Sequence, residues 1–233
     1  MFSQTADWYD ALYRGKDYAS EAEAIRAVIA ARRPGTRTVL DVGCGTAEHN
    51  RHLGRHFRVD GIDINPDFVR IAREKCPEGR YAVADMTAFD LGRTYDVVAC
   101  LFSSIGYVKT LDRMESALAA FRAHLAPGGI VLIEPWMTPE AWNPDGRVRM
   151  LTAETPRGSI CRMNVSRVDG RLSILEFHYL IGTAAGIRHV TEVHELGLFT
   201  VRETLAAFER AGLRADHDPG GPTGRGLYIA TAA

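Results

Sequence analysis

Short apolar segments alternate with amphipathic ones over the first 135 residues, and this alternation constrains the fold more than any other feature. The apolar segments are of strand length and nearly continuous in apolar character, as is typical of parallel strands covered on both faces. They lie at residues 38–42, 59–62, 81–84, 95–101 and 130–133. Helical periodicity fills residues 18–33, 46–56, 66–75 and 111–125. Alternating strands and helices predict right-handed crossovers and a Rossmann-like, doubly wound, mostly parallel α/β sheet.

The ends of two predicted helices carry recognisable signals. Ser20 is a good N-cap for the first helix, which stops at Pro34-Gly35. The helix at 111–125 ends before Pro127-Gly128-Gly129. These signals place a helix in front of the first strand and a sharp turn before the fifth.

The pattern changes after Pro135. Four strands are predicted at 147–155, 159–168, 171–181 and 187–196, with turn signals at Pro156-Arg157-Gly158 and Asp169-Gly170. A helix at 201–211 and strands at 213–217 and 227–231 then return to the main sheet. We therefore predict one domain from residues 1–135 and 197–233, with an antiparallel β insert at 136–196 that walls the substrate site and forms a homodimer contact.

Composition excludes several classes of partner. The 233 residues carry a net charge of −1, so no global positive field favours nucleic acid. No apolar run is long enough to span a bilayer, and we expect no membrane partner.

The cysteines are far apart and are interpreted as reduced thiols of a cytoplasmic protein: Cys44, Cys76, Cys100 and Cys161. His49, His52 and His56 share a helical face without further ligand spacing, so no metal is predicted.

The first strand breaks into Gly43-Cys44-Gly45 and opens a helix. Glycines allow a tight turn and a close approach of the backbone to a ligand, and free N–H groups at a helix start attract carboxylate or phosphate. A Gly-x-Gly sequence also fits a plain tight turn. Asp63 follows the second strand, about 20 residues after Asp41, the spacing at which an acid reaches ribose hydroxyls. With Asp85 after the third strand, the set predicts an adenosine-containing cofactor.

Glu48 decides between the two cofactors that fit this arrangement. A dinucleotide fingerprint requires a third glycine at this position, and a glutamate there would repel a pyrophosphate. S-adenosylmethionine has no phosphate and carries a sulfonium. The residues favour S-adenosylmethionine, with an NAD-dependent oxidoreductase as a weaker alternative.

Residues 36–135 resemble motif I and the following strands of class I S-adenosylmethionine-dependent methyltransferases. The resemblance implies that Asp63 binds the ribose and that Asp85-Met86 contacts the adenine. The Asn/Asp-Pro-Pro-Tyr/Phe block of enzymes that methylate nucleobases is absent after the fourth strand. The implied cofactor residues are Tyr9, Tyr18, Asp41, Gly43, Cys44, Gly45, Asp63, Ile64, Asp85, Met86, Leu101 and Phe102.

A closer resemblance spans nearly the whole chain. The segments at 9–10, 15–18, 102–107, 134–136, 176–179, 198–200 and 220–227 resemble N,N-dimethyltransferases of dTDP-3-amino-3,6-dideoxyhexoses, of the desosamine and mycaminose type. The Gly-Gly-Pro-x-Gly-Arg-Gly-Leu ending is distinctive. This chain departs from the family at Gly43, Asp63 and Met137, where alanine, glutamate and tryptophan are usual, and these departures leave the exact sugar open.

The resemblance implies that the substrate is a nucleotide-linked amino sugar bound by Ser104, Tyr107, Glu134, Trp136, Arg162, His178 and Arg225. Arg225 suits the diphosphate and Trp136 the base or sugar. Tyr107 is the candidate catalytic residue that orients the amine, although simple packing explains it equally well. Two alternatives remain open from the sequence: a methyltransferase acting on another natural-product scaffold, and a non-catalytic cofactor-binding protein.

Overall fold

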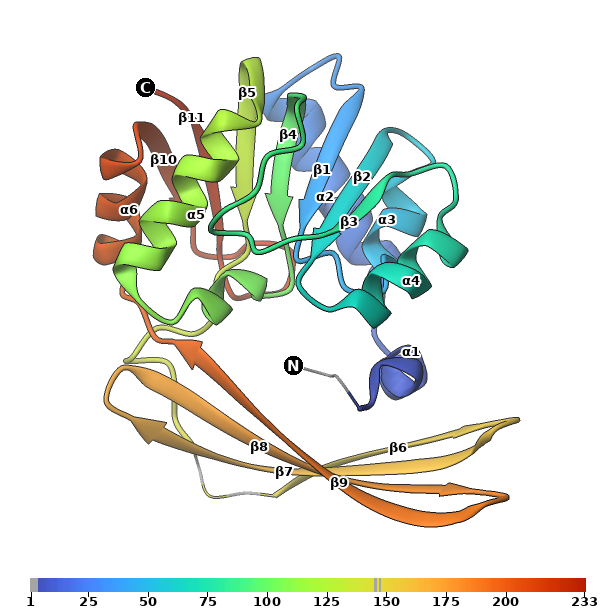
Figure 1. Ribbon diagram of the computed structural model, residues 1–233. Coiled ribbons are helices and arrows are strands. Elements are labelled where there is room, and N and C mark those ends of the chain that lie inside the picture. The colour runs from blue at the N-terminus through green and yellow to red at the C-terminus, as the bar shows by residue number, and fades with distance from the viewer. Residues whose placement is uncertain (1–3, 145, 147) are drawn as a thin grey trace.

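The computed structural model describes residues 4–144, 146 and 148–233, and these form two sheets (Figure 1). The larger sheet has seven strands in the order β10-β11-β5-β4-β1-β2-β3, and the smaller one has four in the order β6-β7-β8-β9. In Figure 1 the smaller sheet lies opposite the lower ends of the larger sheet's strands, with helix α1 between them on one side.

The larger sheet is parallel except at one edge, as the alternating sequence pattern predicts. Its strands are β1 (Thr38–Val42), β2 (Arg58–Asp63), β3 (Tyr81–Val83), β4 (Tyr95–Cys100), β5 (Leu125–Ile133), β10 (Leu213–Asp218) and β11 (Leu227–Ala232). β11 pairs antiparallel with both β5 and β10, whereas the other strand pairs are parallel. The carboxyl ends of β1, β2, β3, β4 and β5 therefore meet at one edge of the sheet, where open α/β sheets bind ligands.

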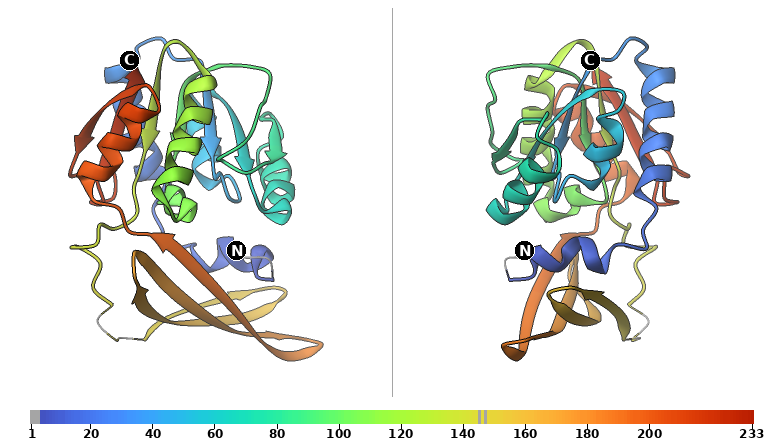
Figure 2. Two further views of the ribbon diagram at one scale, coloured as in Figure 1. Left: turned by 60° about the vertical axis from the view of Figure 1, so that its left-hand side comes forward. Right: turned by 90° about the vertical axis from the view of Figure 1, so that its right-hand side faces the viewer.

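Helices cover both faces of this sheet, which explains the continuous apolar strands. They are α2 (Tyr18–Arg32), α3 (Glu48–Leu53), α4 (Pro66–Lys75), α5 (Leu111–Ala123) and α6 (Val201–Arg210). Val39 packs in one buried cluster with Ile29 of α2, and the next residue, Leu40, packs in another with Phe121 of α5. The side views in Figure 2 show α2 on the opposite side of the sheet from α5 and α6.

The smaller sheet is a fully antiparallel meander of β6 (Arg149–Thr155), β7 (Gly158–Asp169), β8 (Leu172–Thr183) and β9 (Gly186–Gly197). The predicted first strand began at Arg147, which lies outside the described residues. On β8 the side chains of Phe177, Tyr179 and Ile181 are buried, whereas Leu180 is exposed. The inward face forms a cluster with the N-terminal helices η1 (Ala6–Trp8) and α1 (Tyr9–Leu12).

Several local predictions were wrong at element ends. Asp17, not Ser20, caps α2, because its carboxylate accepts from the Ser20 N–H at 2.9 Å. The predicted helix at 46–56 is reduced to the six residues of α3, since Ala47 before it adopts a left-handed conformation with φ of 64°. β5 begins at Leu125 and includes the Pro-Gly-Gly turn. The short helix η2 (Ser104–Val108) was not predicted.

The structure bears on two of the compositional arguments. None of the helices in the described part of the chain is long and apolar enough to cross a membrane. All four cysteines are free, and burial raises the thiol pKa of Cys44 and Cys100 well above its usual value. These two thiols therefore serve as packing groups rather than nucleophiles.

Candidate functional site

A cavity of about 620 Å³ lies between the carboxyl ends of the parallel strands and the inward face of the smaller sheet. Every residue predicted to bind the cofactor lines it. Of the residues predicted to bind the substrate, Ser104, Tyr107, Trp136, Arg162 and Arg225 also line it, and the remaining two do not. One continuous cavity thus brings together side chains from both sheets.

The glycine loop after β1 is shaped by its bonds to the end of β2. The N–H groups of Gly43 and Cys44 donate to the Ile62 carbonyl at 2.8 and 3.0 Å, and the Gly45 N–H donates to Asp63 Oδ2 at 2.9 Å. We expected free N–H groups in this loop, and for these three that expectation was wrong. Amides already bonded to protein are not available to a phosphate, which argues for a cofactor without one at this turn.

Gly43 is a loop position where a side chain would be both strained and crowded. Its φ is 74°, and a Cβ built there would lie 2.7 Å from the Cβ of Ser104. The Ser104 hydroxyl donates to the Gly43 carbonyl at 3.2 Å. A side chain at this position would therefore require the loop or η2 to shift.

Asp41 is a buried acid at the bottom of the cavity. It is 2% exposed, and its Oδ1 has no hydrogen-bond partner among the described residues. Burial raises the pKa of this carboxyl from 3.8 to about 7. A buried oxygen without a donor is costly unless a ligand supplies one. The ammonium of a bound amino acid portion would satisfy it, so the acid fits S-adenosylmethionine.

Two further acids follow β2 and β3. Asp63 accepts from the N–H groups of Asn65 and Gly45, and burial nevertheless raises its pKa above the usual value. Asp85 accepts from the N–H and hydroxyl of Thr87 and pairs with Arg113 at 3.0 Å. Burial alone would raise the pKa of Asp85, but these bonds together lower it. Asp63 and Asp85 both line the cavity.

Glu48 is partly neutralised. Its carboxylate pairs with Lys75 at 2.6 Å and with Arg51 at 3.3 Å. Glu48 lines the cavity beside the glycine loop, so the loop presents an acid where a dinucleotide site would present a glycine.

Glu134 lies beneath the cavity rather than in its wall, unlike the prediction that it contacts substrate. It is 2% exposed, and its Oε2 accepts from the Phe102 N–H at 2.7 Å. This bond holds a turn in which Phe102 and Ser103 have φ of 49° and 63°. Glu134 also accepts from the Thr223 hydroxyl. Its observed role is to fix two loops that line the cavity.

Arg225 reaches the cavity from the glycine-rich loop before β11. Its Nη1 donates to the Ser103 hydroxyl at 3.3 Å and lies 3.8 Å from Glu134 Oε1. The guanidinium lies over the rings of Phe102 and Trp136, with 5.4 and 5.8 Å to the ring centroids. Aromatic faces and one buried carboxylate thus hold its planar donors at the cavity wall.

Arg162 is a buried cation that lacks an anionic partner. It is 7% exposed, and its Nη1 donates to the Tyr13 hydroxyl at 3.0 Å. Its Nε has no hydrogen-bond partner, and no carboxylate lies within ion-pair distance among the residues that the structure describes. Its guanidinium lies 4.6 Å from the centroid of the Phe177 ring. A buried positive charge of this kind favours an anionic ligand in the cavity.

His178 lies on the outer face of the smaller sheet, away from the cavity. Its Nε2 lies 2.9 Å from Glu176 and its Nδ1 3.1 Å from His189, both outward-facing neighbours. The structure therefore does not support the predicted substrate contact. The alternation of side chains along β8 could have shown this. Phe177 and Tyr179, on either side of His178, are buried, so His178 must face outward.

Other cavity residues were missed by the sequence argument. They include Tyr13, Asn65, Phe68, Ser103, Arg113, Trp142, Asn164, Phe177 and His194. His194 is in phase with the buried Val190 and Leu196 on β9, so strand alternation could have placed it inside. Trp142, whose ring centroid lies 5.3 Å from that of Trp136, comes from an irregular segment without such a signal.

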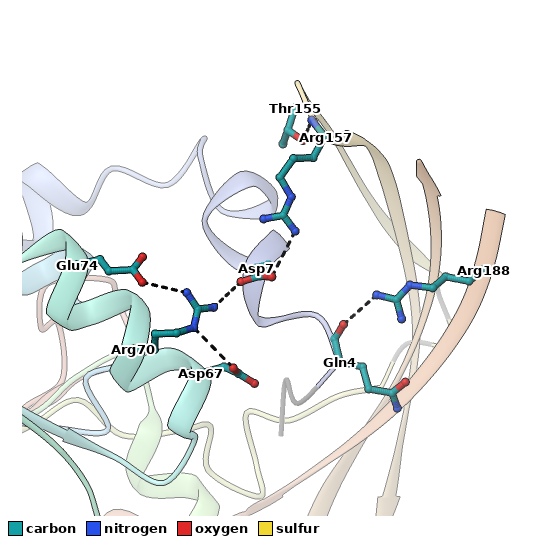
Figure 3. Close-up of polar contacts among 8 residues, drawn as sticks. All are labelled: Gln4, Asp7, Asp67, Arg70, Glu74, Thr155, Arg157 and Arg188. Carbon is teal, nitrogen blue, oxygen red and sulfur yellow. Dashed lines mark hydrogen bonds and ion pairs between the residues drawn. The ribbon is translucent and has the colours of Figure 1, made fainter. Parts of the chain in front are cut away.

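The N-terminal segment contacts both helix α4 and the smaller sheet (Figure 3). Asp7 accepts from Arg70 of α4 at 2.8 Å and from Arg157, in the turn between β6 and β7, at 3.3 Å. The Gln4 carbonyl accepts from Arg188 of β9 at 3.2 Å. We call Gln4, Asp7, Arg70, Arg157 and Arg188 the N-terminal clasp. It holds Tyr9, two residues after Asp7, at the cavity.

Comparison with known proteins agrees with this geometry. A family model described as a methyltransferase domain matches residues 39–129. The chain is 38% identical, over 98% of both chains, to a dTDP-3-amino-3,4,6-trideoxy-alpha-D-glucopyranose N,N-dimethyltransferase of Streptomyces venezuelae. It is 37% identical to a dTDP-4-amino-2,3,4,6-tetradeoxy-D-glucose N,N-dimethyltransferase of Saccharopolyspora spinosa, over 96% of this chain and 91% of the other.

Solved structures give the same result. The crystal structure of DesVI from Streptomyces venezuelae superposes with a TM-score of 0.90 at 38% identity, covering 98% of both chains. An S-adenosylmethionine-bound amino pentose methyltransferase from Micromonospora echinaspora has a TM-score of 0.84 at 39% identity, over 97% of this chain and 96% of that one.

The fold, the glycine loop and the acids at successive strand ends define a class I S-adenosylmethionine-dependent methyltransferase. More particularly, the chain belongs to the family that contains the dTDP-amino sugar N,N-dimethyltransferases.

Replacing Asp63 by alanine tests the proposed ribose contact. Charge-assisted hydrogen bonds are worth about 1.5 to 3 kcal/mol each, so Asp63→Ala should lower affinity for S-adenosylhomocysteine at least tenfold. Isothermal titration calorimetry measures the change, with Asp67→Ala, a half-exposed acid in α4, as control. An unchanged dissociation constant would contradict the assignment of Asp63.

Asp41 should make the stability of the free protein depend on pH. Because its pKa rises from 3.8 to about 7 on folding, the stability contributed by its proton is complete below the lower value and is lost as pH rises through the upper one. Asp41→Asn stays neutral and should gain stability relative to wild type across this window. Urea unfolding at several pH values measures the difference, with exposed Asp112→Asn as control. A difference that stays constant with pH would contradict the burial argument.

Proposed function

We propose that the protein transfers methyl groups from S-adenosylmethionine to the amino group of a dTDP-linked amino deoxysugar, and that it adds two of them, as an enzyme of natural-product biosynthesis in the cytoplasm. The observation that carries the proposal is the single cavity in which the acid-lined strand ends face Arg162, Arg225 and Trp136. Full-length similarity to enzymes named for such substrates supports it. The free cysteines support the cytoplasmic location.

The strand ends of the larger sheet would hold the cofactor. Asp41 suits its ammonium group, Asp63 the ribose hydroxyls and Asp85 with Met86 the adenine. When bound, S-adenosylmethionine supplies a methyl group as an activated electrophile. Tyr9, Tyr18 and Phe102 give aromatic walls that exclude water and face the sulfonium region.

The other half of the cavity suits a nucleotide sugar. Arg225 and Arg162 offer cationic planar donors for a diphosphate, and Trp136 offers a surface for the base or the sugar. Ser104, which bonds the glycine loop, and Tyr107 line the same cavity, and we place the amine beside them. Tyr107 orients that amine through its hydroxyl.

The chemistry requires mainly orientation. A neutral amine held in line with the donor's S–CH₃ bond reacts through positioning, which is worth roughly 7 to 11 kcal/mol in well-oriented systems. No nucleophilic side chain is needed. Burial raises the thiol pKa of Cys44, which lines the cavity, and of Cys100, so neither thiol is an effective nucleophile.

A direct assay tests the function. The protein would be incubated with S-adenosylmethionine and dTDP sugars that carry the amine at C3 or at C4, and the products counted by mass spectrometry. We expect a product two methyl groups heavier than one of these substrates. Absence of methylation on all of them, with the cofactor bound, would contradict the proposal.

Arg225 should act on substrate binding rather than on the chemical step. It is proposed to hold the diphosphate, remote from the amine, so Arg225→Ala should raise KM for the nucleotide sugar about tenfold or more while sparing most of kcat. Arg225→Lys should recover part of the loss, and Arg214→Ala on the exposed side of β10 serves as control. If KM for every nucleotide sugar is unchanged, the substrate half of this proposal is wrong.

We also propose that the outer face of the smaller sheet forms a homodimer contact. It exposes Met150, Met163, Val165, Leu180 and Val193, each between 44% and 59% accessible, from all four strands. Several large apolar side chains exposed on one sheet face favour a covered state. Light scattering of the wild type should give twice the mass of one chain. The Leu180→Glu variant should give a mass closer to that of a single chain. A wild-type mass near 25.7 kDa at micromolar concentration would contradict the dimer.

A further inference from the structure

A chain of three side chains leads away from the cavity into the interior of the smaller sheet. The Tyr107 hydroxyl lies 2.8 Å from Nδ1 of His194 on β9. Nε2 of His194 lies 3.7 Å from Glu192 Oε2. Glu192 in turn accepts from the Thr5 hydroxyl and the Gln4 N–H, each at 3.0 Å. His194 is 1% exposed and Glu192 is 7% exposed, so bulk water does not substitute for these contacts.

The direction of the bonds follows from the charge of Glu192. A carboxylate near Nε2 favours the tautomer that carries its proton there, which leaves Nδ1 as an acceptor. The Tyr107 hydroxyl therefore donates to His194. Its oxygen keeps lone pairs free to accept a proton from a group in the cavity, which Tyr107 lines.

The electrostatics leave the His194 imidazole neutral and therefore able to accept a proton. Burial lowers the pKa of His194 although Glu192 opposes this, so the imidazole is neutral near pH 7. Burial also raises the pKa of Tyr107 far above its usual value, so the phenol does not ionise by itself. Other charged or titratable groups facing the pair are Arg162 of β7, Asp63 of β2, Tyr13 after α1 and Tyr179 of β8. Arg162 disfavours an imidazolium at His194, and the Glu192 carboxylate favours it.

We propose that this chain removes the proton that the substrate amine must lose before each methylation, with Tyr107 as the catalytic residue that touches the amine and His194, oriented by Glu192, as the acceptor acting through it. The inference rests on the function proposed above. An amine beside electron-withdrawing groups has a pKa of roughly 8, so most of it is ammonium at neutral pH. The first methylation regenerates an ammonium, so the second transfer again requires deprotonation.

The proton balance is simple. An N–H bond of the ammonium breaks and an O–H bond forms on Tyr107, while the original phenolic proton moves to His194 Nδ1. The amine keeps the lone pair with which it forms the new N–C bond as the S–C bond of the donor breaks. The imidazolium next to Glu192 then returns its proton through Tyr107 to water that enters when the spent cofactor is exchanged.

His194→Asn separates the relay from a structural role, because an amide oxygen can accept the Tyr107 hydrogen bond but does not titrate. Rates of the first and second methyl transfer would be measured against pH by mass spectrometry. Near pH 7 we expect about a tenfold slower second transfer, with accumulation of the monomethylated sugar, and recovery near pH 9.5 where the amine is neutral. Tyr107→Phe should give the same profile, and the double variant should be no slower.

The outcome that would overturn the relay is a loss of the same size at every pH, or an unchanged profile. Exposed His56→Asn, in the loop after α3, is the matched control and should behave as wild type. Thermal unfolding confirms that each variant is folded, and Tyr107→Phe carries the test if His194→Asn is not. A wild type that methylates no amino sugar at any pH would contradict the proposed function itself.

A second readout does not depend on turnover. Histidine NMR titration of the free protein gives the pKa of His194 directly. An opposite charge at this distance shifts a pKa by about one unit or more, so Glu192→Gln should lower the pKa of His194 by about one unit. Glu176→Gln on the outer face should leave it unchanged. Equal His194 titrations in wild type and Glu192→Gln would show that Glu192 does not stabilise the imidazolium, against the proposal.

Discussion

The bonds between the glycine loop and the end of β2 are the constraint on which the rest of the site depends. The Ile62 carbonyl accepts from two successive N–H groups of the loop, and Asp63 accepts from a third. These bonds fix the loop backbone at the sheet edge, and they place the Asp63 carboxylate and the buried Asp41 on the same cavity wall. η2, which carries Tyr107 to the cavity, packs closely against Gly43 of this loop.

The cavity holds two buried polar groups that lack a complementary partner among the described residues. Asp41 has a buried oxygen without a donor, and Arg162 has a buried guanidinium without an anion in the described chain. Each is unfavourable in the free protein, since buried charge without a partner is costly. A cationic donor at one end and an anionic nucleotide at the other would relieve both. The cavity therefore favours a cationic group near Asp41 and an anionic group near Arg162 over the opposite arrangement.

Sequence patterns predicted the strand ends well because buried parallel strands are recognisable as continuous apolar segments. Asp41 and Asp63 could be assigned to the ligand edge for that reason. Glu134 also ends a strand, yet it points beneath the cavity, because the turn at Phe102 and Ser103 adopts positive φ values that no local pattern in these residue types predicts. On the smaller sheet, a shift of one residue separates the inward His194 from the outward His178. The lining by Trp142 depends on an irregular loop, whose path only the folded structure shows.

The N-terminal clasp has a consequence for turnover. A dimethylating enzyme must release the demethylated cofactor and admit a new one before its second transfer, so part of the wall has to yield and reform within each catalytic cycle. The clasp side chains Asp7, Arg70 and Arg157 are 45% to 62% exposed, and such ion pairs are individually weak and screened by salt. Breaking these ion pairs costs little, so the buried apolar contacts of Trp8 and Leu12 with the smaller sheet set how readily the N-terminal segment yields during each cycle.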